Sequence, residues 1–185
     1  MIKLLTSIWI VSILACTQTN TKQESGNDYS QTNSDWRTLE QSTYSVQYPS
    51  TWELNQSRQM GTTFVLFSPL ESDKDTFKEN VNLLIQDLRG QNIDLNRYTE
   101  ISEAQIKSMV ANSSLIESKR IKNGDDEYHK LMYSGDQGSL QLLFEQYYWV
   151  INDKAFVLTY TSEKAKFADY RETGEQILNS FKLKR

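Results

Sequence analysis

The chain has 185 residues, enough for one ordinary domain with additional segments at its ends. Hydrophobic residues make up 38% of it, and 20 Lys and Arg against 24 Asp and Glu give a formal charge of −4. An acidic chain with dispersed charges lacks the basic stripe that displaces counterions from a nucleic acid, so nucleic acid is not the expected partner.

The first 15 residues have the organisation of an export signal. Lys3 supplies a positive charge, and an apolar stretch follows from Leu4 to Leu14. This stretch is shorter than the roughly 20 residues that a membrane-spanning helix needs. We therefore predict a signal peptide at residues 1–15, and a plain N-terminal membrane anchor is the alternative.

The run Ile13-Leu14-Ala15-Cys16 resembles the lipobox of bacterial lipoproteins, with a small residue directly before the cysteine. The resemblance implies cleavage between Ala15 and Cys16, diacylglycerol on the Cys16 thiol, and acylation of the new amino group. Several acyl chains give durable attachment to a membrane, whereas one chain alone is marginal. An ordinary secretory signal with a cysteine that falls there by chance is the alternative. Which membrane or leaflet holds the anchor stays open.

A polar segment separates the signal from the rest of the chain. Residues 16–34 contain one aromatic side chain, Tyr29, and no aliphatic one, so they bury too little apolar surface to offset the entropy of ordering. We predict a flexible tether there and one folded domain at residues 35–185. The chain has one cysteine, so the domain has no disulfide and depends on its core.

Alternating apolar residues predict a series of strands, each bounded by a turn or a loop. Short connections between consecutive strands favour antiparallel pairing, and the pair Asn152-Asp153 predicts a tight turn. A second turn is expected at Gly135–Gly138. The expected strands are 44–48, 52–54, 61–67, 80–88, 115–121, 128–133, 140–151 and 155–160.

Two segments have the periodicity of a helix instead. Ser102 and Gln105 resemble a capping box, and the apolar stripe after it includes Ile106 and Met109. A second stripe runs through 167–181. Because both faces of the long strands are apolar, helices or loops must cover both. The predicted fold class is α+β, an antiparallel β-sheet flanked by two helices.

Several short motifs, in this order and spacing, resemble those of PsbP-like domains. They are Tyr44-Ser-Val-Gln-Tyr-Pro-Ser-Thr-Trp52, Phe67-Ser-Pro69, Phe77-Lys-Glu-Asn-Val-Asn82, Phe156-Val-Leu-Thr-Tyr160 and Ile177-Leu-Asn-Ser-Phe181. The resemblance covers roughly residues 44–184, nearly the whole predicted domain, and implies a Mog/PsbP-like α/β/α sandwich. It also implies a non-enzymatic scaffold that binds another macromolecule. PsbP binds photosystem II and Mog-type proteins bind a small GTPase, and no binding motif of either can be carried over to residues of this chain.

Few side chains could take part in catalysis or metal binding. His129 is the only histidine, so it lacks partners for a metal centre or a catalytic triad and is expected to be structural. Asp73, Asp75 and Glu79 lie in a charged loop without the glycine and terminal glutamate of a calcium loop. The run Asp125-Asp126-Glu127 is expected to be a solvated turn. The sequence contains no nucleotide-binding or hydrolase motif, and we expect neither an enzyme nor a cofactor or metal.

Large rings concentrate on one predicted strand, where Tyr147, Tyr148 and Trp149 follow Phe144. Core packing is the ordinary role of such rings. Alternatively, Tyr147 and Trp149 form an interface that anchors a partner, because aromatic residues dominate binding hot spots.

Together these features predict an extracytoplasmic lipoprotein of a bacterial cell envelope, anchored to a membrane by lipid on Cys16. The expected function is a non-catalytic protein-binding or assembly module with an envelope protein as partner. A carrier or sensor of a small apolar or ionic ligand is the alternative.

Overall fold

The computed structural model describes residues 35–58, 61–124 and 126–184. The predicted signal peptide with Ala15, the lipidation site Cys16 and the tether at 16–34 lie outside the described residues, as does Asp125.

The described residues form ten strands and two α-helices in an α+β arrangement. In chain order they are β1 Trp36–Glu40, β2 Tyr44–Pro49, β3 Glu53–Asn55, β4 Thr62–Phe67, β5 Asn80–Asp87, α1 Leu95–Met109, β6 Ala111–Asn123, β7 Asp126–Gln137, β8 Leu140–Ile151, β9 Lys154–Glu163, α2 Phe167–Ser180 and β10 Lys182–Leu183. None of the helices in these residues is long and apolar enough to cross a membrane.

Seven strands form the main sheet, in the order β3-β4-β5-β9-β8-β7-β6, and all neighbours are antiparallel. The predicted antiparallel hairpins are found in the consecutive strands β6, β7, β8 and β9, which are joined by short connections. Asn152 and Asp153 have φ of 51° and 56°, the left-handed pair that a two-residue hairpin turn requires. The smaller strands β1, β2 and β10 form a second sheet.

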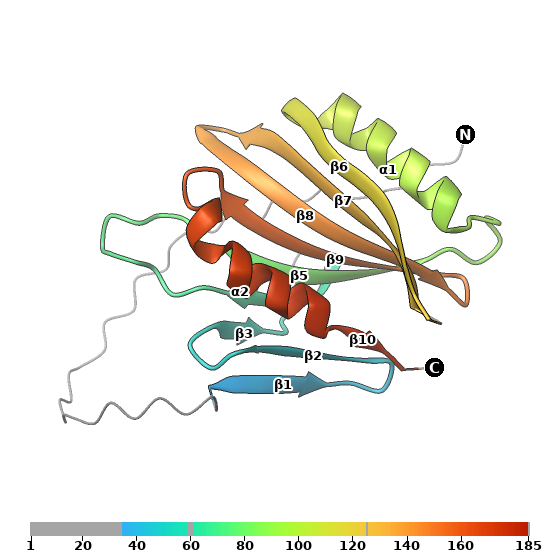
Figure 1. The fold of residues 1–185 in the computed structure, drawn as a ribbon, viewed down its shortest axis with the longest axis horizontal. Helices are drawn as coiled ribbons and strands as arrows, with labels where there is room; N and C mark the ends of the chain where they lie inside the picture. The colour runs from blue at the N-terminus through green and yellow to red at the C-terminus, as the bar shows by residue number, and fades with distance from the viewer. Residues whose placement is uncertain (1–34, 59–60, 125, 185) are drawn as a thin grey trace.

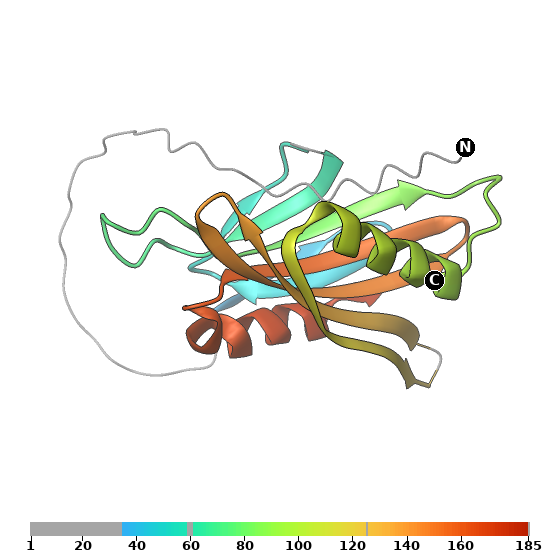
Figure 2. The ribbon, with the colours of Figure 1, turned by 90° about the horizontal axis from the view of Figure 1, so that it is seen from above.

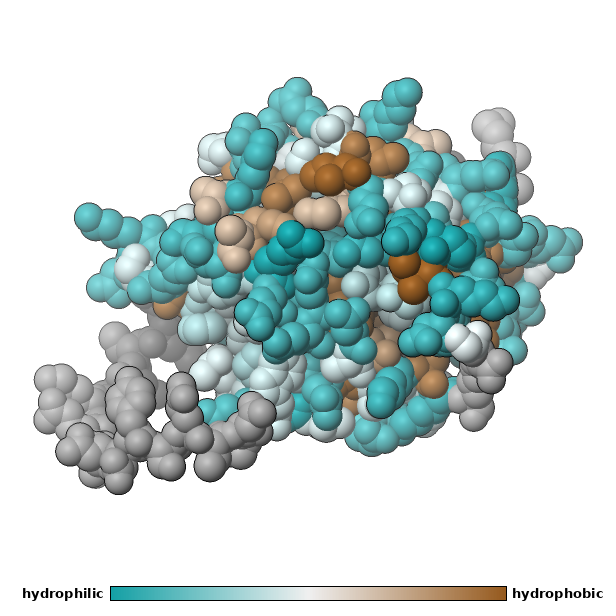
Figure 3. Space-filling view, viewed as in Figure 1, coloured by the Kyte–Doolittle hydropathy of each residue, from teal (hydrophilic) through white to brown (hydrophobic). Residues whose placement is uncertain are grey.

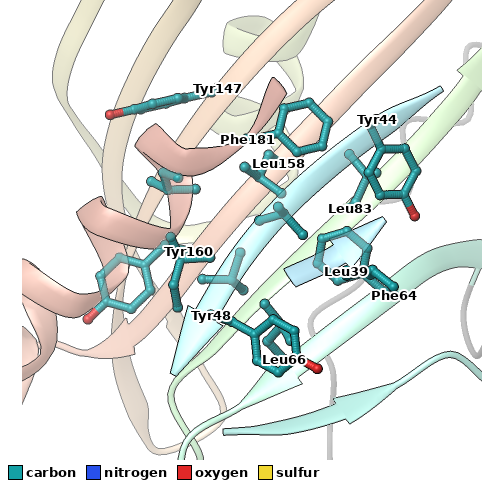
Figure 4. Packing of buried hydrophobic residues seen from close by; sticks show 14 of the residues in the cluster. Leu39, Tyr44, Tyr48, Phe64, Leu66, Leu83, Tyr147, Leu158, Tyr160 and Phe181 are labelled. Carbon is teal, nitrogen blue, oxygen red and sulfur yellow. The ribbon is translucent and has the colours of Figure 1, made fainter. Parts of the chain in front are cut away.

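The main sheet carries a hydrophobic core on each face, which confirms the predicted helix-covered sheet. Helix α1 covers β6, β7 and β8 on one face, while α2 and the small sheet cover the other (Figures 1 and 2). Strand β9 serves both cores: Leu158 and Tyr160 point toward α2, and Val157 points toward α1. Figure 4 shows how aromatic and aliphatic side chains from both sheets and α2 fill the larger core.

The second helix packs closely on β9 because it has a glycine at the point of contact. Gly174 is buried, and a Cβ placed on it would lie 2.7 Å from a ring carbon of Tyr160. The ring of Phe167, in the first turn of α2, stacks on the same tyrosine with centroids 5.8 Å apart. The predicted apolar stripe of this helix is therefore confirmed.

The predicted start of α1 is wrong, and its predicted apolar stripe is correct only in part. The helix begins at Leu95, and Asp94 caps it by accepting a hydrogen bond from the N–H of Arg97. Ser102 lies inside the helix, where its hydroxyl donates to the carbonyl of Tyr98. Ile106 is buried as the stripe predicts, but Met109 is exposed, and the chain is already in β6 two residues later.

Three further boundaries differ from the sequence prediction. Strand β7 continues through the expected turn at Gly135 and ends only at Gln137. Strand β1 was not predicted, because its residues are mostly exposed and lack a regular alternation. The two residues of β10 pair with β2 far away in the chain, which no local pattern reveals.

Candidate functional site

The chain passes from α1 into β6 without a loop, and this junction forms an exposed corner of the domain. The N–H of Val110 donates to the carbonyl of Ile106 and closes the helix, and β6 starts at Ala111. Asn112 has a φ of 50°, a left-handed conformation that an asparagine tolerates better than most residues. Its side-chain amide donates to Asp136 Oδ2 at 2.6 Å, which joins the start of β6 to the end of β7.

Large apolar side chains are exposed at this junction. Met109 is 67% exposed, Leu115 50% and Ile116 53%. We call these three residues the α1–β6 corner. Figure 3 shows the corresponding apolar surface over β6, surrounded by polar residues. Single exposed apolar residues are ordinary, but three in the short segment from the end of α1 into β6 mark this segment as a candidate interaction site.

Strand β6 is also the last strand of the main sheet, so within the described residues one of its edges has no neighbouring strand. Its pairing with β7 is interrupted between Ala111 and Ser114 and again between Leu115 and Glu117. Bulges of this kind twist an edge and limit unwanted pairing. From Glu117 to Asn123 the pairing is uninterrupted, so a regular edge remains available there.

A polar cleft of about 180 Å³ lies beside the start of β6, at one end of the main sheet. Its charged side chains are Asp136 from β7 and Lys164 from the turn after β9, and the N–H of Lys164 donates to the carbonyl of Gln141. The remaining lining residues are Asn112, Ser134, Gly135, Gln141 and Leu142. The cleft therefore offers both charge signs and several hydrogen-bonding groups to a small ion.

The structure places Tyr147 and Trp149, the predicted interface pair, in the core that faces α2. Their exposed fractions are 4% and 2%. Tyr147 donates to Asn179 at 3.2 Å, and Trp149 Nε1 donates to Asp126 at 3.1 Å. This is the core-packing alternative, and a partner that docks on the folded domain would have to contact other side chains.

His129 is buried beneath α1 and belongs to a short hydrogen-bonded chain. Ser118 Oγ donates to Glu103 Oε1 at 2.5 Å and lies 2.8 Å from His129 Nε2. Because the hydroxyl proton is used toward Glu103, we assign the Nε2–H of His129 as the donor to Ser118. The imidazole therefore does not accept the serine proton, as a base that activates a nucleophile must. Burial, and then the charge of Arg120, lower the pKa of His129.

The acidic candidates shape the chain locally. Asp75 accepts hydrogen bonds from the N–H groups of Glu71 and Phe77, so it folds its own loop, while Asp73 is exposed. Glu79 is only 2% exposed and lies between the hydroxyls of Ser68 and Ser162, each 3.4 Å away. Burial raises the pKa of Glu79. Within the described ranges, no cluster of three or more acidic, His or Cys side chains could hold a metal.

The second acidic group, at residues 126–127, is exposed. Asp126 accepts a hydrogen bond from the indole of Trp149, and Glu127 forms an ion pair with Arg120 at 3.6 Å. Both residues are exposed, as expected, but they open strand β7 rather than form a turn, and their contacts are structural.

A buried charge network lies between β7, β8 and α2. Glu145 is fully buried, and Lys130 Nζ is 2.8 Å from its Oε1. Glu117 and Glu175 approach the same ammonium group to 3.6 Å and 4.0 Å. Burial lowers the pKa of Lys130, but the hydrogen bond and charge of Glu145, helped by these two carboxylates, outweigh it and raise the pKa overall.

The α1–β6 corner escaped the sequence analysis. Its visible signal is the adjacent pair Leu115-Ile116 inside an otherwise polar strand. Two adjacent residues of a regular strand point to opposite faces, so both could be buried only if both faces were covered. The sequence could not reveal that β6 lies at the edge of the sheet.

Comparisons with known proteins agree with this fold. The PsbP family model matches residues 36–183. The cyanobacterial PsbP of Synechocystis sp. PCC 6803 superposes with a TM-score of 0.58 at 14% identity, covering 86% of this chain and 98% of that one. LpqN of Mycobacterium tuberculosis, described as involved in cell envelope biogenesis, gives 0.62 at 12% identity and covers 81% and 91%.

PA94 of Pseudomonas aeruginosa, a protein of unknown function, gives a TM-score of 0.56 at 11% identity and covers 78% and 94%. No curated protein matches the sequence significantly. At these identities the solved structures establish the fold alone. The family model spans almost the whole described domain, and the chain therefore belongs to the PsbP family.

Proposed function

We propose that this chain is a bacterial envelope lipoprotein whose PsbP domain binds a protein partner close to the membrane and catalyses no reaction. The leader is cleaved after Ala15, and lipid on Cys16 holds the mature chain at the membrane. In support, the lipobox and the polar segment both precede residue 36, where the family match begins. LpqN, which is described as involved in cell envelope biogenesis, has the same fold and supports a location in the cell envelope.

The observation that carries the binding proposal is the α1–β6 corner. Met109, Leu115 and Ile116 are each at least half exposed, although the domain has ample core on both faces of its sheet. Burying such side chains against a partner yields about 25 cal/mol per Å² of apolar surface. The corner thus provides a driving force for association.

The tether would strengthen such binding without any new contact. A flexible coil of about 18 residues has an r.m.s. span of roughly 25 Å, so the domain stays close to the bilayer. Confinement of this kind raises the effective concentration of membrane-associated partners, up to the millimolar range for short linkers.

The polar groups that could support catalysis are already committed elsewhere. His129 donates to Ser118, Lys130 is surrounded by carboxylates, and Glu79 is enclosed by two serines. None of these groups faces the cleft of about 180 Å³, whose lining residues are different. The separation of these buried groups from the cleft, whose own titratable residues are Asp136 and Lys164, supports a non-catalytic role.

The cleft itself favours a second candidate function, the binding of a small ionic ligand. Asp136 and Lys164 present opposite charges at its wall, which suits a zwitterion or a hydrated salt better than an apolar molecule. Calorimetric titration with small amino and carboxylic acids, with Lys164→Ala as the matched variant, tests this role. If no compound binds the parent chain at millimolar concentration, the carrier alternative fails.

The main proposal is tested in cells with the full-length chain. A photoactivatable amino acid is placed at Ile116, and at Glu172 on the exposed side of α2 as the control. We expect Ile116 to crosslink to a protein of the envelope and Glu172 not to do so. Equal crosslinking from both positions, or none from Ile116, would refute the corner as a binding site. The anchor is tested separately, because Cys16→Ala should shift the chain from the detergent phase to the aqueous phase.

A further inference from the structure

We propose that the free edge of β6 pairs with β6 of a second copy of this chain, antiparallel and about a two-fold axis at Ser118. This inference rests on the proposed function, because it names one partner of the strand that carries the α1–β6 corner. It begins from the regular stretch Glu117–Asn123, where no other described strand occupies the outer edge.

Two-fold symmetry restricts the registers of such a pair, because the central residue lies opposite itself. Centres at Glu117, Lys119 or Arg120 place two like charges directly opposite each other, and a centre at Ile121 places Arg120 opposite Lys122. Like charges in directly opposed positions destabilise a strand pair. Of the centres from Glu117 to Ile121, therefore, only Ser118 avoids repulsion.

The register about Ser118 also creates favourable contacts. It places Glu117 of each copy opposite Lys119 of the other, so the pair forms two ion pairs between copies. Within the regular stretch this register pairs Glu117–Lys119 directly, while Arg120 and Ile121 lie toward the bulged residues Ile116 and Leu115 of the other copy. The charged residues beside Ser118 are thus self-complementary.

The charges within one copy leave these groups available. Lys119 is exposed, and among the described residues no carboxylate forms an ion pair with it. Glu117 contacts Lys130 only at 3.6 Å and shares that ammonium group with Glu145 and Glu175. A lysine from a second copy would therefore add a cation to a group of carboxylates that outnumbers its cations.

One strand pair buries less surface than the roughly 1,600 Å² of a standard interface, so we expect a weak dimer that the membrane tether promotes. The test therefore traps the contact in membranes that contain the full-length chain. In the Ser118→Cys variant, which gives up the contacts of the Ser118 hydroxyl with Glu103 and His129, the two new thiols should lie opposite each other, with Cβ atoms about 5 Å apart. Mild oxidation should then yield a disulfide-linked dimer.

The matched control is Lys122→Cys, an exposed position on the same strand. In the proposed register the two copies of residue 122 are eight positions apart, roughly 26 Å, and cannot form a disulfide. The parent chain, whose only cysteine is Cys16, controls for linkage through that residue. Equal dimer yields from Ser118→Cys and Lys122→Cys would indicate random collision and would overturn the proposal.

Charge reversal provides the decisive comparison. In the Ser118→Cys background, Lys119→Glu alone or Glu117→Lys alone should lower the dimer yield about tenfold, and the two together should restore it. Co-expression of the two single variants should also restore it, because each supplies the charges that the other lacks. Thermal melts verify folding, and Lys119→Glu is the safer variant since no described contact of that side chain is lost.

The outcome separates this inference from the proposed function. A yield that does not respond to charge reversal, or no dimer from Ser118→Cys, overturns self-pairing. If Ile116 still crosslinks to another envelope protein in that case, the binding function stands without the dimer. If Ile116 captures no protein and Ser118→Cys gives no dimer, both proposals fail.

Discussion

We expect Gly174→Ala in α2 to destabilise the domain, although alanine is the better helix former. In an exposed helix this substitution would gain about 1 kcal/mol. Here the new Cβ would lie 2.7 to 2.8 Å from three ring carbons of Tyr160, closer than carbon atoms approach in folded proteins. The ring is fully buried and packs against Phe167, so it has little room to move.

The helix must therefore shift outward or the tyrosine must leave its rotamer, and overpacking of this kind costs about 1–3 kcal/mol. Because that cost equals or exceeds the gain in helix propensity, the free energy of unfolding should fall by up to about 2 kcal/mol. Urea unfolding followed by tryptophan fluorescence measures it. Glu172→Ala, at an exposed position of the same helix, is the control and should change stability by less than about 0.5 kcal/mol.

A double variant sharpens the test. In a Tyr160→Leu background the ring is absent, so Gly174→Ala should be neutral or stabilising there. If Gly174→Ala stabilises the chain that retains Tyr160, the close approach of α2 to β9 is not the constraint that we infer.

Three further predictions concern buried groups and the exposed corner. Burial raises the pKa of Glu79, so its ionised form is unfavourable in the folded state. Glu79→Gln should therefore raise the melting temperature at pH 7 but not at pH 3. An equal rise at both pH values would contradict this reasoning. The pKa of His129 is lowered, so folding favours its neutral form. The contribution of His129 to stability is therefore complete above about pH 6.5 and is lost as the pH falls below that value. His129→Gln should therefore lose less stability than the parent between pH 7.5 and pH 5, as urea unfolding would report. Leu115→Ser should leave the melting temperature within about 2 °C of the parent but weaken crosslinking from Ile116, because Leu115 is half exposed; a large loss of stability would mean that it belongs to the core.

Where a sequence signal depended on neighbours along the chain, it agreed with the structure. The alternation in residues 140–151 and 155–160 and the Asn152-Asp153 pair predicted a hairpin, and β8, β9 and their tight turn confirm it. The apolar stripe of the second helix is likewise confirmed at Phe167, Gly174 and Ile177. These signals are reliable because strand and helix periods act over a few residues.

The errors occurred where a local pattern allowed two interpretations. Ser102 and Gln105 fit a capping box, but the helix had begun seven residues earlier at Leu95, and Ser102 donates to the backbone one turn back. Met109 fits the apolar stripe of α1, but it is the last residue of the helix and is exposed, although Ile106 in the same turn is buried. Ser102 is a residue type suited to a helix cap, and Met109 is one suited to an apolar stripe. The contacts of α1 with β6, β7 and β8 decided where these two side chains lie.

By itself, the sequence determined the compartment signals that we propose, the antiparallel α+β class and the family, because these depend on composition, period and ordered short motifs. Only the tertiary structure decided which strands lie at the edge of the main sheet and which rings are buried. Trp149, an interface candidate, is in the core, whereas Leu115 and Ile116, in an ordinary predicted strand, are exposed. The physical reason is that burial depends on strand order and on which helix covers which face, and these arise from contacts between residues distant in the chain.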